Sequence, residues 1–201
     1  MSVPISTAFY ERNELVTTES TARRSDAERN VERIVDAAIA CLSEQNDAAM
    51  GEIAARAGVG RATLYRHFPN RVTLLEAIHD RAVSEAEDAV LASRPEEGPA
   101  AEAMSRLVES LAGVIERYRV LSTHKHELSD ERESDVIRSY VVGVIERGQA
   151  SGEFTQDVPS GVLADMLKGM MMAACTEGDA VPAGRLVARV LVHGLDPDPS
   201  T

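Results

Sequence analysis

The segment from Gly58 to Arg71, GVGRATLYRHFPNR, has room for a helix of only two turns. Gly60 precedes this predicted helix and Pro69 follows it. Because the residue before a proline avoids the α region, the helix must end at Phe68. The apolar segment before it, residues 50–57, is equally short and is followed by Gly58, a residue typical of helix C-termini. Two short helices separated by a glycine turn predict a helix-turn-helix.

The rest of the chain shows helical periodicity and no strand alternation. Apolar residues recur three and four positions apart over residues 25–42, 70–93, 101–120, 131–147 and 159–175, and Pro182 to His193 adds a further predicted helix. Aromatic residues make up 3% of the chain and tryptophan is absent, so the core must consist of Ala, Leu, Val, Ile and Met. We therefore predict an all-α fold with an N-terminal three-helix DNA-binding domain and a helical C-terminal domain.

Composition and local patterns predict three parts. Residues 1–24 are rich in Ser and Thr without a sustained period, which indicates a flexible tail. Ser25 and Glu28 have the spacing of a capping box, so the first helix is expected to begin there. The helix-turn-helix domain is predicted over residues 25–72 and the helical domain over residues 73–201.

Charge is distributed unevenly along the chain. The formal net charge is −12, but residues 23–75 carry eight arginines against seven acidic residues, whereas residues 76–201 carry 12 basic against 23 acidic residues, a net −11. Screening at physiological salt limits repulsion to about 8 Å, so an N-terminal unit of relatively positive potential can bind a polyanion. The overall acidity therefore does not exclude DNA as a partner.

Cysteine usage and hydropathy indicate the compartment. Cys41 and Cys175 are far apart and form no CxxC motif, so we expect two buried, reduced thiols in a reducing cytoplasm. The N-terminus lacks the pattern of a signal peptide, and no run of about 18 apolar residues occurs. We predict a cytoplasmic protein that does not span a membrane.

The predicted second helix of the motif has the chemistry of a DNA-reading helix. The major groove of DNA admits one α-helix. Leu64 and Phe68 lie on one face and are expected to anchor the helix inward. Side chains that are long or polar enough to reach phosphates or base edges are Arg61, Thr63, Tyr65 and Arg66.

The stretch IAARAGVGRATLYRHFPNRVTLLEAI, residues 53–78, resembles the DNA-binding signature of the TetR family of bacterial transcriptional regulators. The resemblance spans residues 26–76. It implies that Tyr65 contacts a phosphate, that Phe68 anchors the core, and that Arg71 grips the DNA backbone. The DNA-facing residues that it implies are Arg61, Ala62, Thr63, Tyr65, Arg66, His67 and Arg71.

This chain departs from the family pattern at the start of two helices. Family members usually carry Thr or Ser where this chain has Ala48-Ala49-Met50-Gly51, so a hydroxyl contact to phosphate is missing there. Gly60 stands where Ser often caps the short helix, which leaves its N-terminus open to phosphate. His67 can either read a base or serve as a C-terminal cap or packing residue.

The resemblance also implies a C-terminal domain that binds a small-molecule effector and forms a homodimer through its last two helices. Such a dimer would place two recognition helices about 34–36 Å apart on a pseudo-palindromic operator. Packing within one subunit explains the same apolar residues. The residues proposed for the ligand are Arg117, Tyr118, Tyr140, Met170 and Met171. Those proposed for the dimer interface are Leu163, Met166, Met170, Leu186, Val190 and Leu191.

These patterns predict a DNA-binding regulator, specifically a repressor that an effector releases from its operator. An activator or ligand-independent regulator, and a helical protein–protein adaptor, remain alternatives. The sequence contains no GxSxG, HExxH, P-loop or dinucleotide-binding pattern, so we expect no catalysis and no cofactor. Neighbouring positions in the segment from His124 to Glu127 do not converge on one point, so we expect a solvated surface there and no metal site. The expected partners are double-stranded DNA, an effector and a second copy of the chain.

Overall fold

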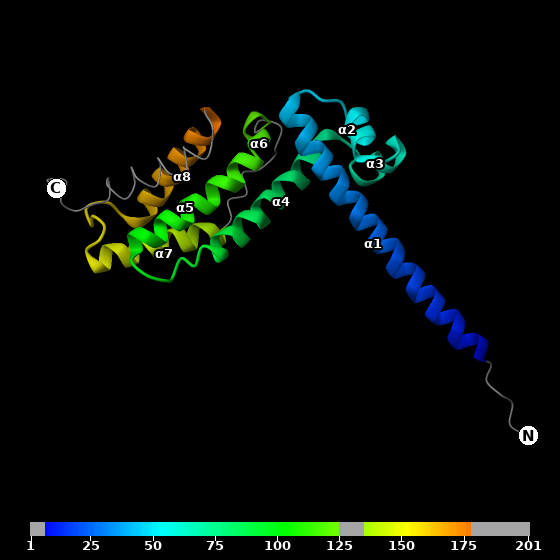
Figure 1. Ribbon diagram of the computed structural model, residues 1–201, viewed down its shortest axis with the longest axis horizontal. Helices are drawn as coiled ribbons and strands as arrows, with labels where there is room; N and C mark the ends of the chain where they lie inside the picture. Colours follow the sequence, from blue (N-terminus) through cyan, green and yellow to red (C-terminus); the bar gives the residue numbers. More distant parts are fainter. Residues whose placement is uncertain (1–6, 125–134, 178–201) are drawn as a thin grey trace, which may run out of the picture. The chain divides into compact units, whose positions relative to one another are not determined.

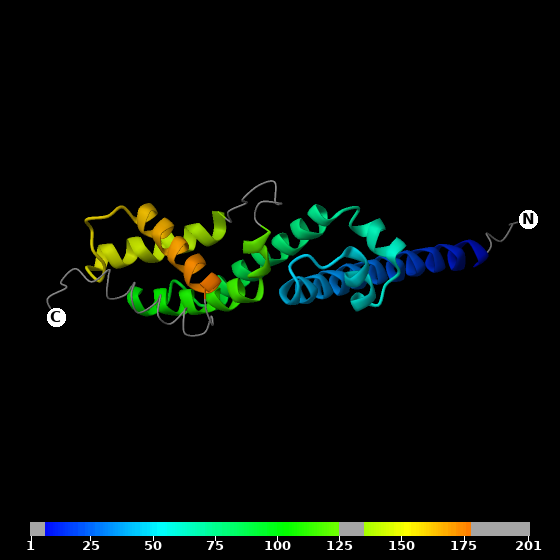
Figure 2. The same ribbon diagram turned by 90° about the horizontal axis from the view of Figure 1, so that it is seen from above.

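The computed structural model describes residues 7–124 and 135–177, and all regular structure in these ranges is helical, which confirms the predicted all-α class (Figures 1 and 2). The chain divides into two compact units, with the division between Leu74 and Leu75. The first unit contains α1 (Thr7–Glu44), α2 (Met50–Ala57) and α3 (Arg61–His67), and α4 (Arg71–Ala92) begins in it. The second contains the rest of α4, α5 (Ala100–Arg117), α6 (Val120–Thr123), α7 (Asp135–Ser151) and α8 (Ser160–Glu177).

In the first unit, α2 packs on α1 and α3 packs on α2 (Figure 1). The core is small and aliphatic, and Phe68 is its aromatic member. Its buried side chains include Ile34, Ala38, Leu42, Ile53, Ala54, Leu64 and Phe68. The predicted start of α4 is correct, because Asn70 Oδ1 accepts a hydrogen bond of 3.0 Å from the Thr73 amide, as a helix N-cap does.

The first helix is longer than its sequence pattern predicts. We expected it to begin at the Ser25 capping box, but α1 is one helix from Thr7 to Glu44, so residues 7–24 are helical. The physical reason is the absence of a breaker: between Pro4 and Gly51 the chain has neither proline nor glycine. A capping box starts a helix only where the preceding chain is not already helical.

The second unit is built around α5, α7 and α8, which lie side by side (Figures 1 and 2). Their facing side chains form one core, which includes Met104, Leu107, Val108, Val144, Ile145, Phe154, Leu163, Leu167 and Met171. The amide of Ala101 donates a hydrogen bond of 3.1 Å to Glu153 Oε2, so the end of α7 lies beside the start of α5 and the two helices are antiparallel.

Four predicted details of the helices are wrong. The periodicity that predicts a helix over residues 131–147 ends just before Gly148, a residue type that often ends helices, but α7 runs from Asp135 to Ser151 and contains that glycine. The helical periodicity over residues 70–93, 131–147 and 159–175 places Val72, Val136 and Met166 on the apolar stripes, but their exposed fractions are 36%, 44% and 55%. All three are apolar residues near helix ends or on an outer face, where periodicity alone does not show which neighbours are present.

Two further sequence predictions concern thiols and membranes. Cys41 is a buried free thiol, as predicted, whereas the side chain of Cys175 lies outside the described residues. Among the helices that the structure describes, none combines the length and the hydropathy that crossing a membrane would require.

Gly148 is required by a close approach to an aromatic ring. A Cβ atom at this position would lie 2.1 Å from Phe154 Cδ2, and Phe154 is only 1% exposed. We therefore predict that Gly148→Ala lowers the free energy of unfolding by ~1–3 kcal/mol through overpacking. Thermal and urea unfolding measure the change.

Gly143→Ala is the matched control, because a Cβ at this exposed position of the same helix meets no atom within 4 Å. It should leave stability unchanged or raise it by up to ~1 kcal/mol. Equal effects of the two substitutions would contradict the predicted ring contact.

Candidate nucleic-acid interface

The turn between α2 and α3 fixes the direction of the short helix. Gly58 adopts the left-handed conformation, with φ 65° and ψ 34°, and its amide donates to Ala55 O at 3.1 Å. The amide of Val59 donates to Ala54 O at 3.0 Å, which completes the C-terminal cap of α2. Gly60 is then the N-cap of α3 and provides no side-chain hydrogen bond. The N-terminus of α3 therefore has no side-chain cap, as the sequence predicts.

The short helix presents a cationic, aromatic face to solvent. Leu64 is fully buried and Phe68 is 6% exposed, so these two side chains anchor α3 as predicted. Thr63 and His67 are half-buried. The remaining residues expected to face DNA from α3 are all exposed: Arg61, Ala62, Tyr65 and Arg66. Tyr65 is 48% exposed, so its ring and hydroxyl group are accessible to a partner.

The position of His67 bears on the two roles that the sequence left open, contact with a DNA base and packing or capping within the protein. Its Nε2 atom is buried and has no hydrogen-bond partner among the residues that the structure describes. Its ring centroid lies 6.5 Å from that of Phe68. In this arrangement the Nε2 atom does not face solvent, so the geometry favours the packing alternative for that nitrogen.

Arg71 holds the loop before α2. Its Nη1 donates to Ala48 O at 2.8 Å and its Nη2 donates to Asn46 O at 2.5 Å. The resemblance implied a grip on the DNA backbone, and the structure adds an internal role that the sequence did not indicate. Contact between Arg71 and DNA stays a prediction.

Arg33 holds the other end of α2 and was missed by the sequence analysis. Its Nη2 donates to Ala57 O at 2.5 Å and to Gly58 O at 3.1 Å. The last carbonyls of a helix lack partners within it, and a cationic donor satisfies them. The sequence indicates that these carbonyls need a hydrogen-bond donor. It does not indicate which residue supplies it, because Arg33 precedes Ala57 by 24 positions and no local spacing connects the two.

An ion pair also joins α1 to α2. Arg56 Nη1 lies 2.6 Å from Glu44 Oε2, and Arg56 Nη2 lies 2.8 Å from Glu44 Oε1. This two-pronged contact holds the pKa of Glu44 below its ordinary value, chiefly through the hydrogen bonds from Arg56. Arg56 is therefore engaged within the unit.

Gly51 explains part of the unusual start of α2. A Cβ atom at this position would lie 2.7 Å from Arg61 Nη2, so the guanidinium of Arg61 rests against the first turn of α2. The amide of Ala49, the residue before this turn, donates to Glu52 Oε2 at 2.9 Å. The first turn of α2 thus lacks the hydroxyl group that is usual in the family, but the Arg61 side chain reaches this turn from α3.

We predict that Gly51→Ala weakens DNA binding without destabilising the protein. The new methyl group displaces the flexible Arg61 side chain, while alanine favours the helix. We expect a Kd for DNA up to about tenfold higher, measured by fluorescence anisotropy, with an unchanged or higher Tm.

The Arg61→Ala background tests the cause. There, Gly51→Ala should have no further effect on affinity, since the displaced side chain is absent. A full effect in both backgrounds would show that the methyl group acts in another way.

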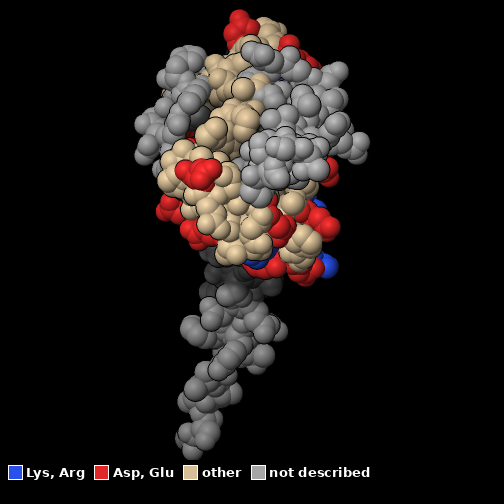
Figure 3. Space-filling model, turned by 90° about the vertical axis from the view of Figure 1, so that its left-hand side faces the viewer, with Lys and Arg blue, Asp and Glu red and all other residues tan. Residues whose placement is uncertain are grey.

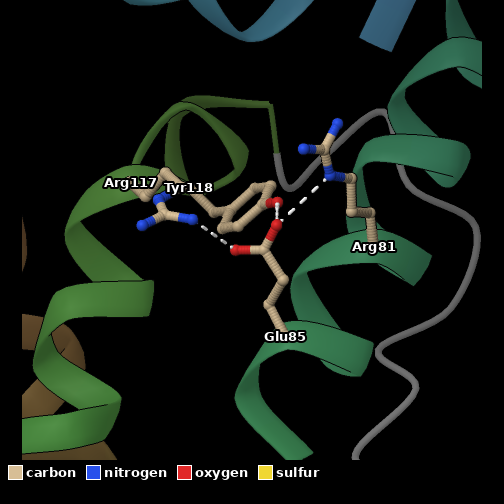
Figure 4. Close-up of polar contacts among 4 residues, drawn as sticks. All are labelled: Arg81, Glu85, Arg117 and Tyr118. Carbon is tan, nitrogen blue, oxygen red and sulfur yellow. Dashed lines mark hydrogen bonds and ion pairs between the residues drawn. The ribbon is translucent and has the colours of Figure 1, made fainter. Parts of the chain in front are cut away.

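Two of the residues proposed for the ligand belong to a polar cluster around Glu85 (Figure 4). Tyr118 Oη donates to Glu85 Oε1 at 2.7 Å, Arg117 Nη1 donates to Oε2 at 2.8 Å, and Arg81 Nε donates to Oε1 at 3.2 Å. Burial raises the pKa of Glu85, but the hydrogen bonds from Tyr118 and Arg81 and the charges of the two arginines outweigh it and lower the pKa. The cluster ties α4 to the C-terminal end of α5.

Tyr118 is therefore a structural donor in this conformation. It is 4% exposed, and burial together with its bond to Glu85 raises its pKa to about 12. Of the other residues proposed for the ligand, Met171 is buried in the core, and Tyr140 and Met170 are partly buried against it. Their contact with a ligand stays a prediction.

We predict that Glu85→Gln reduces the loss of stability in acid. A carboxyl group with a lowered folded-state pKa stabilises the fold above its unfolded-state pKa, and this contribution is lost as pH falls through the folded-state value. The wild-type Tm should therefore fall more steeply between pH 6 and pH 3 than that of the variant.

Tyr118→Phe should lower the free energy of unfolding by ~1–3 kcal/mol at neutral pH, because a buried bond to a charged group is lost. Parallel Tm curves for the wild type and Glu85→Gln across the acid range would contradict the role of Glu85.

The residues proposed for the dimer interface separate into different environments. Leu163 is buried in the core of its own unit, and Met170 is partly buried against that core. Met166 is exposed, while Leu186, Val190 and Leu191 lie outside the described residues. Val162, which the sequence analysis did not single out, is 48% exposed. Val162, Met166, Gly169 and Ala173 are all exposed and lie on one face of α8. This face is apolar.

On the described surface drawn in Figure 3, acidic side chains (red) are more frequent than basic ones (blue), and most of the remaining surface is neither acidic nor basic. Among the described residues, no group of three or more His, Cys, Asp or Glu side chains could hold a metal ion. The expectation of a solvated surface at His124 is wrong, because its side chain is 5% exposed. Residues 125–127 lie outside the described ranges.

Comparisons with known proteins agree with this geometry. A family model described as "Bacterial regulatory proteins, tetR family" matches residues 34–78. Over 83 residues the chain is 41% identical to the HTH-type transcriptional repressor LfrR of Mycolicibacterium smegmatis; this match covers 41% of the chain and spans 44% of the length of LfrR.

Solved structures extend the similarity to most of the chain. LfrR from Mycobacterium smegmatis in complex with proflavine has a TM-score of 0.62 and 26% identity, with 83% of this chain and 96% of that chain covered. The regulator PfmR from Thermus thermophilus has a TM-score of 0.68 and 20% identity, with coverages of 82% and 99%, and shows the same fold.

Proposed function

We propose that this chain, a member of the TetR family of bacterial regulatory proteins, is a transcriptional repressor that a small-molecule effector releases from a pseudo-palindromic operator. Binding of DNA by the first unit is the basis of the proposal. Its site of action is the chromosome, and hence the cytoplasm. The proposed activity is binding, and no catalytic step is assigned to the chain.

The exposed face of α3 carries the proposal. Arg61, Tyr65 and Arg66 point to solvent while Leu64 and Phe68 hold the helix in the core of the unit. Guanidinium groups form paired hydrogen bonds to phosphates and to guanine edges, and an uncapped helix N-terminus attracts a phosphate. These features fit insertion of α3 into the major groove, with Tyr65 and Arg71 directed to the backbone.

Two observations support an effector and a homodimer. The similar chain LfrR has been solved with proflavine bound, so a related protein of this fold accepts a small molecule. The exposed face of α8 offers apolar surface from Val162 and Met166, which a second copy of the chain can bury. Effector binding would then favour a state in which the two recognition helices no longer match the operator spacing.

Fluorescence anisotropy on labelled DNA from upstream of the protein's own gene tests this function. We predict tight binding that weakens steeply as salt rises, because phosphate contacts release counterions. Arg66→Ala should lower affinity by about tenfold or more, and Tyr65→Ala should reduce affinity for specific and scrambled DNA alike.

Arg119→Ala is the matched control, since Arg119 is an exposed arginine of the second unit. It should bind the upstream DNA as the wild type does. Weak, salt-insensitive binding of the wild type, or equal losses in all three variants, would favour a helical adaptor over a DNA-binding regulator.

A further inference from the structure

Arg147 on α7 presents an unused hydrogen-bonding edge. Its Nε and Nη2 atoms are both buried, and neither has a hydrogen-bond partner among the residues that the structure describes. These two nitrogens form one edge of the planar guanidinium group, with N–H bonds that point in parallel. That edge is the one that binds both oxygens of a carboxylate at once.

The carboxylate beside Arg147 is already occupied. Glu153 Oε2 accepts the Ala101 amide at 3.1 Å, and its Oε1 accepts Ser151 Oγ at 2.8 Å. The backbone amides of Ala101 and Ala100 are the main reason that the pKa of Glu153 is lowered, and the charge of Arg147 contributes least. Glu153 thus lies near Arg147 without forming a hydrogen bond to its free edge.

The second unit has one further buried carboxylate oxygen without a partner among the described residues, Glu116 Oε2. Glu116 is 15 residues along α5 from Ala101, a distance of roughly 22 Å in an α-helix. Because the end of α7 lies beside the start of α5, Glu116 and Arg147 are near opposite ends of the helix pair. Their side chains are too short to meet.

An unpaired guanidinium edge in the interior is unfavourable. Arginine cannot release its proton at physiological pH, so desolvation cannot be relieved by neutralisation. Acceptors placed opposite both nitrogens restore the lost interactions, and an anionic acceptor that binds both does so most strongly. The position therefore calls for an oxyanion that the described residues do not supply.

We propose that Arg147 binds the carboxylate of an apolar carboxylic acid, which acts as the effector of the proposed regulator. A singly charged carboxylate fits better than a doubly charged phosphate because the Glu153 carboxylate already lies near Arg147 and repels a second anion. An apolar tail fits because Val144 and Tyr140, one and two turns before Arg147 on the same face of α7, belong to or pack against the aliphatic core.

The burial of this edge links the ligand to a conformational change. Solvent does not reach Nε or Nη2, so a carboxylate must displace the groups that cover them. The ligand therefore prefers a rearranged state of the second unit over the present one, and this difference in affinity is what effector control requires.

Thermal unfolding of the full chain with sodium octanoate, and with octan-1-ol as the neutral analogue, tests the site. Octanoate should raise the wild-type Tm progressively with concentration, and octan-1-ol should not. Arg147→Met should raise the Tm without ligand, because an unpaired buried charge is removed, and should abolish the octanoate response. Arg147→Lys, which keeps the charge but loses the paired edge, should weaken that response.

Arg119→Met is the matched control, an exposed arginine of the same unit, and should keep both the Tm and the octanoate response. A lower Tm for Arg147→Met would show that the edge is paired in the free protein and would overturn the proposal, as would a response to octanoate that survives Arg147→Met. If the lower Tm depended on protein concentration, the acceptor would be a carboxylate of a second copy.

Because this inference rests on the proposed function, operator binding is measured on the same preparations. Operator binding that is intact but insensitive to octanoate would overturn the effector and leave the regulator standing. Octanoate stabilisation that depends on Arg147, in a protein without sequence-selective DNA binding, would overturn the regulator and with it the effector role, while the carboxylate site itself would stand.

Discussion

Guanidinium groups on backbone carbonyls are the interaction on which the arrangement of this molecule depends. Arg33 binds the carbonyls that end α2, and Arg71 binds those of the loop that precedes it. In the second unit, Arg106 donates to the carbonyls of Ser93, Arg94 and Glu97 and so fixes the turn between α4 and α5. The direction of α3 follows from the first two contacts, since α2 holds it.

The sequence predicted those parts of the fold that backbone chemistry determines locally. The predicted limits of α2 and α3 are nearly those observed, because Gly58 and Pro69 act through their own conformational preferences. The predicted end of α7 failed for a tertiary reason. A glycine at this position is typical of a helix end, but here the missing side chain leaves room for the ring of Phe154. Only the folded chain brings that ring close to Gly148.

The same distinction applies to the candidate site. Helical periodicity was enough to separate the anchoring residues Leu64 and Phe68 from the exposed face of α3. Periodicity did not reveal what a long polar side chain contacts. Tyr118 was proposed for a ligand, but its hydroxyl meets Glu85, which is 33 positions away in sequence. Partners this distant cannot be identified from one sequence, because the residue type of an arginine or tyrosine does not show which acceptor its side chain contacts.

The contact between Gly51 and Arg61 makes the conformation of a side chain on α3 depend on a residue of α2. An engineer who transplanted residues 61–67 into a related scaffold would move the side chains proposed to contact DNA without Gly51, which leaves room for the Arg61 side chain. With a larger residue at position 51, the same helix would present Arg61 differently and could read another sequence. If α3 contacts DNA as proposed, an exchange of operator preference between such proteins requires α2 and α3 to be moved together.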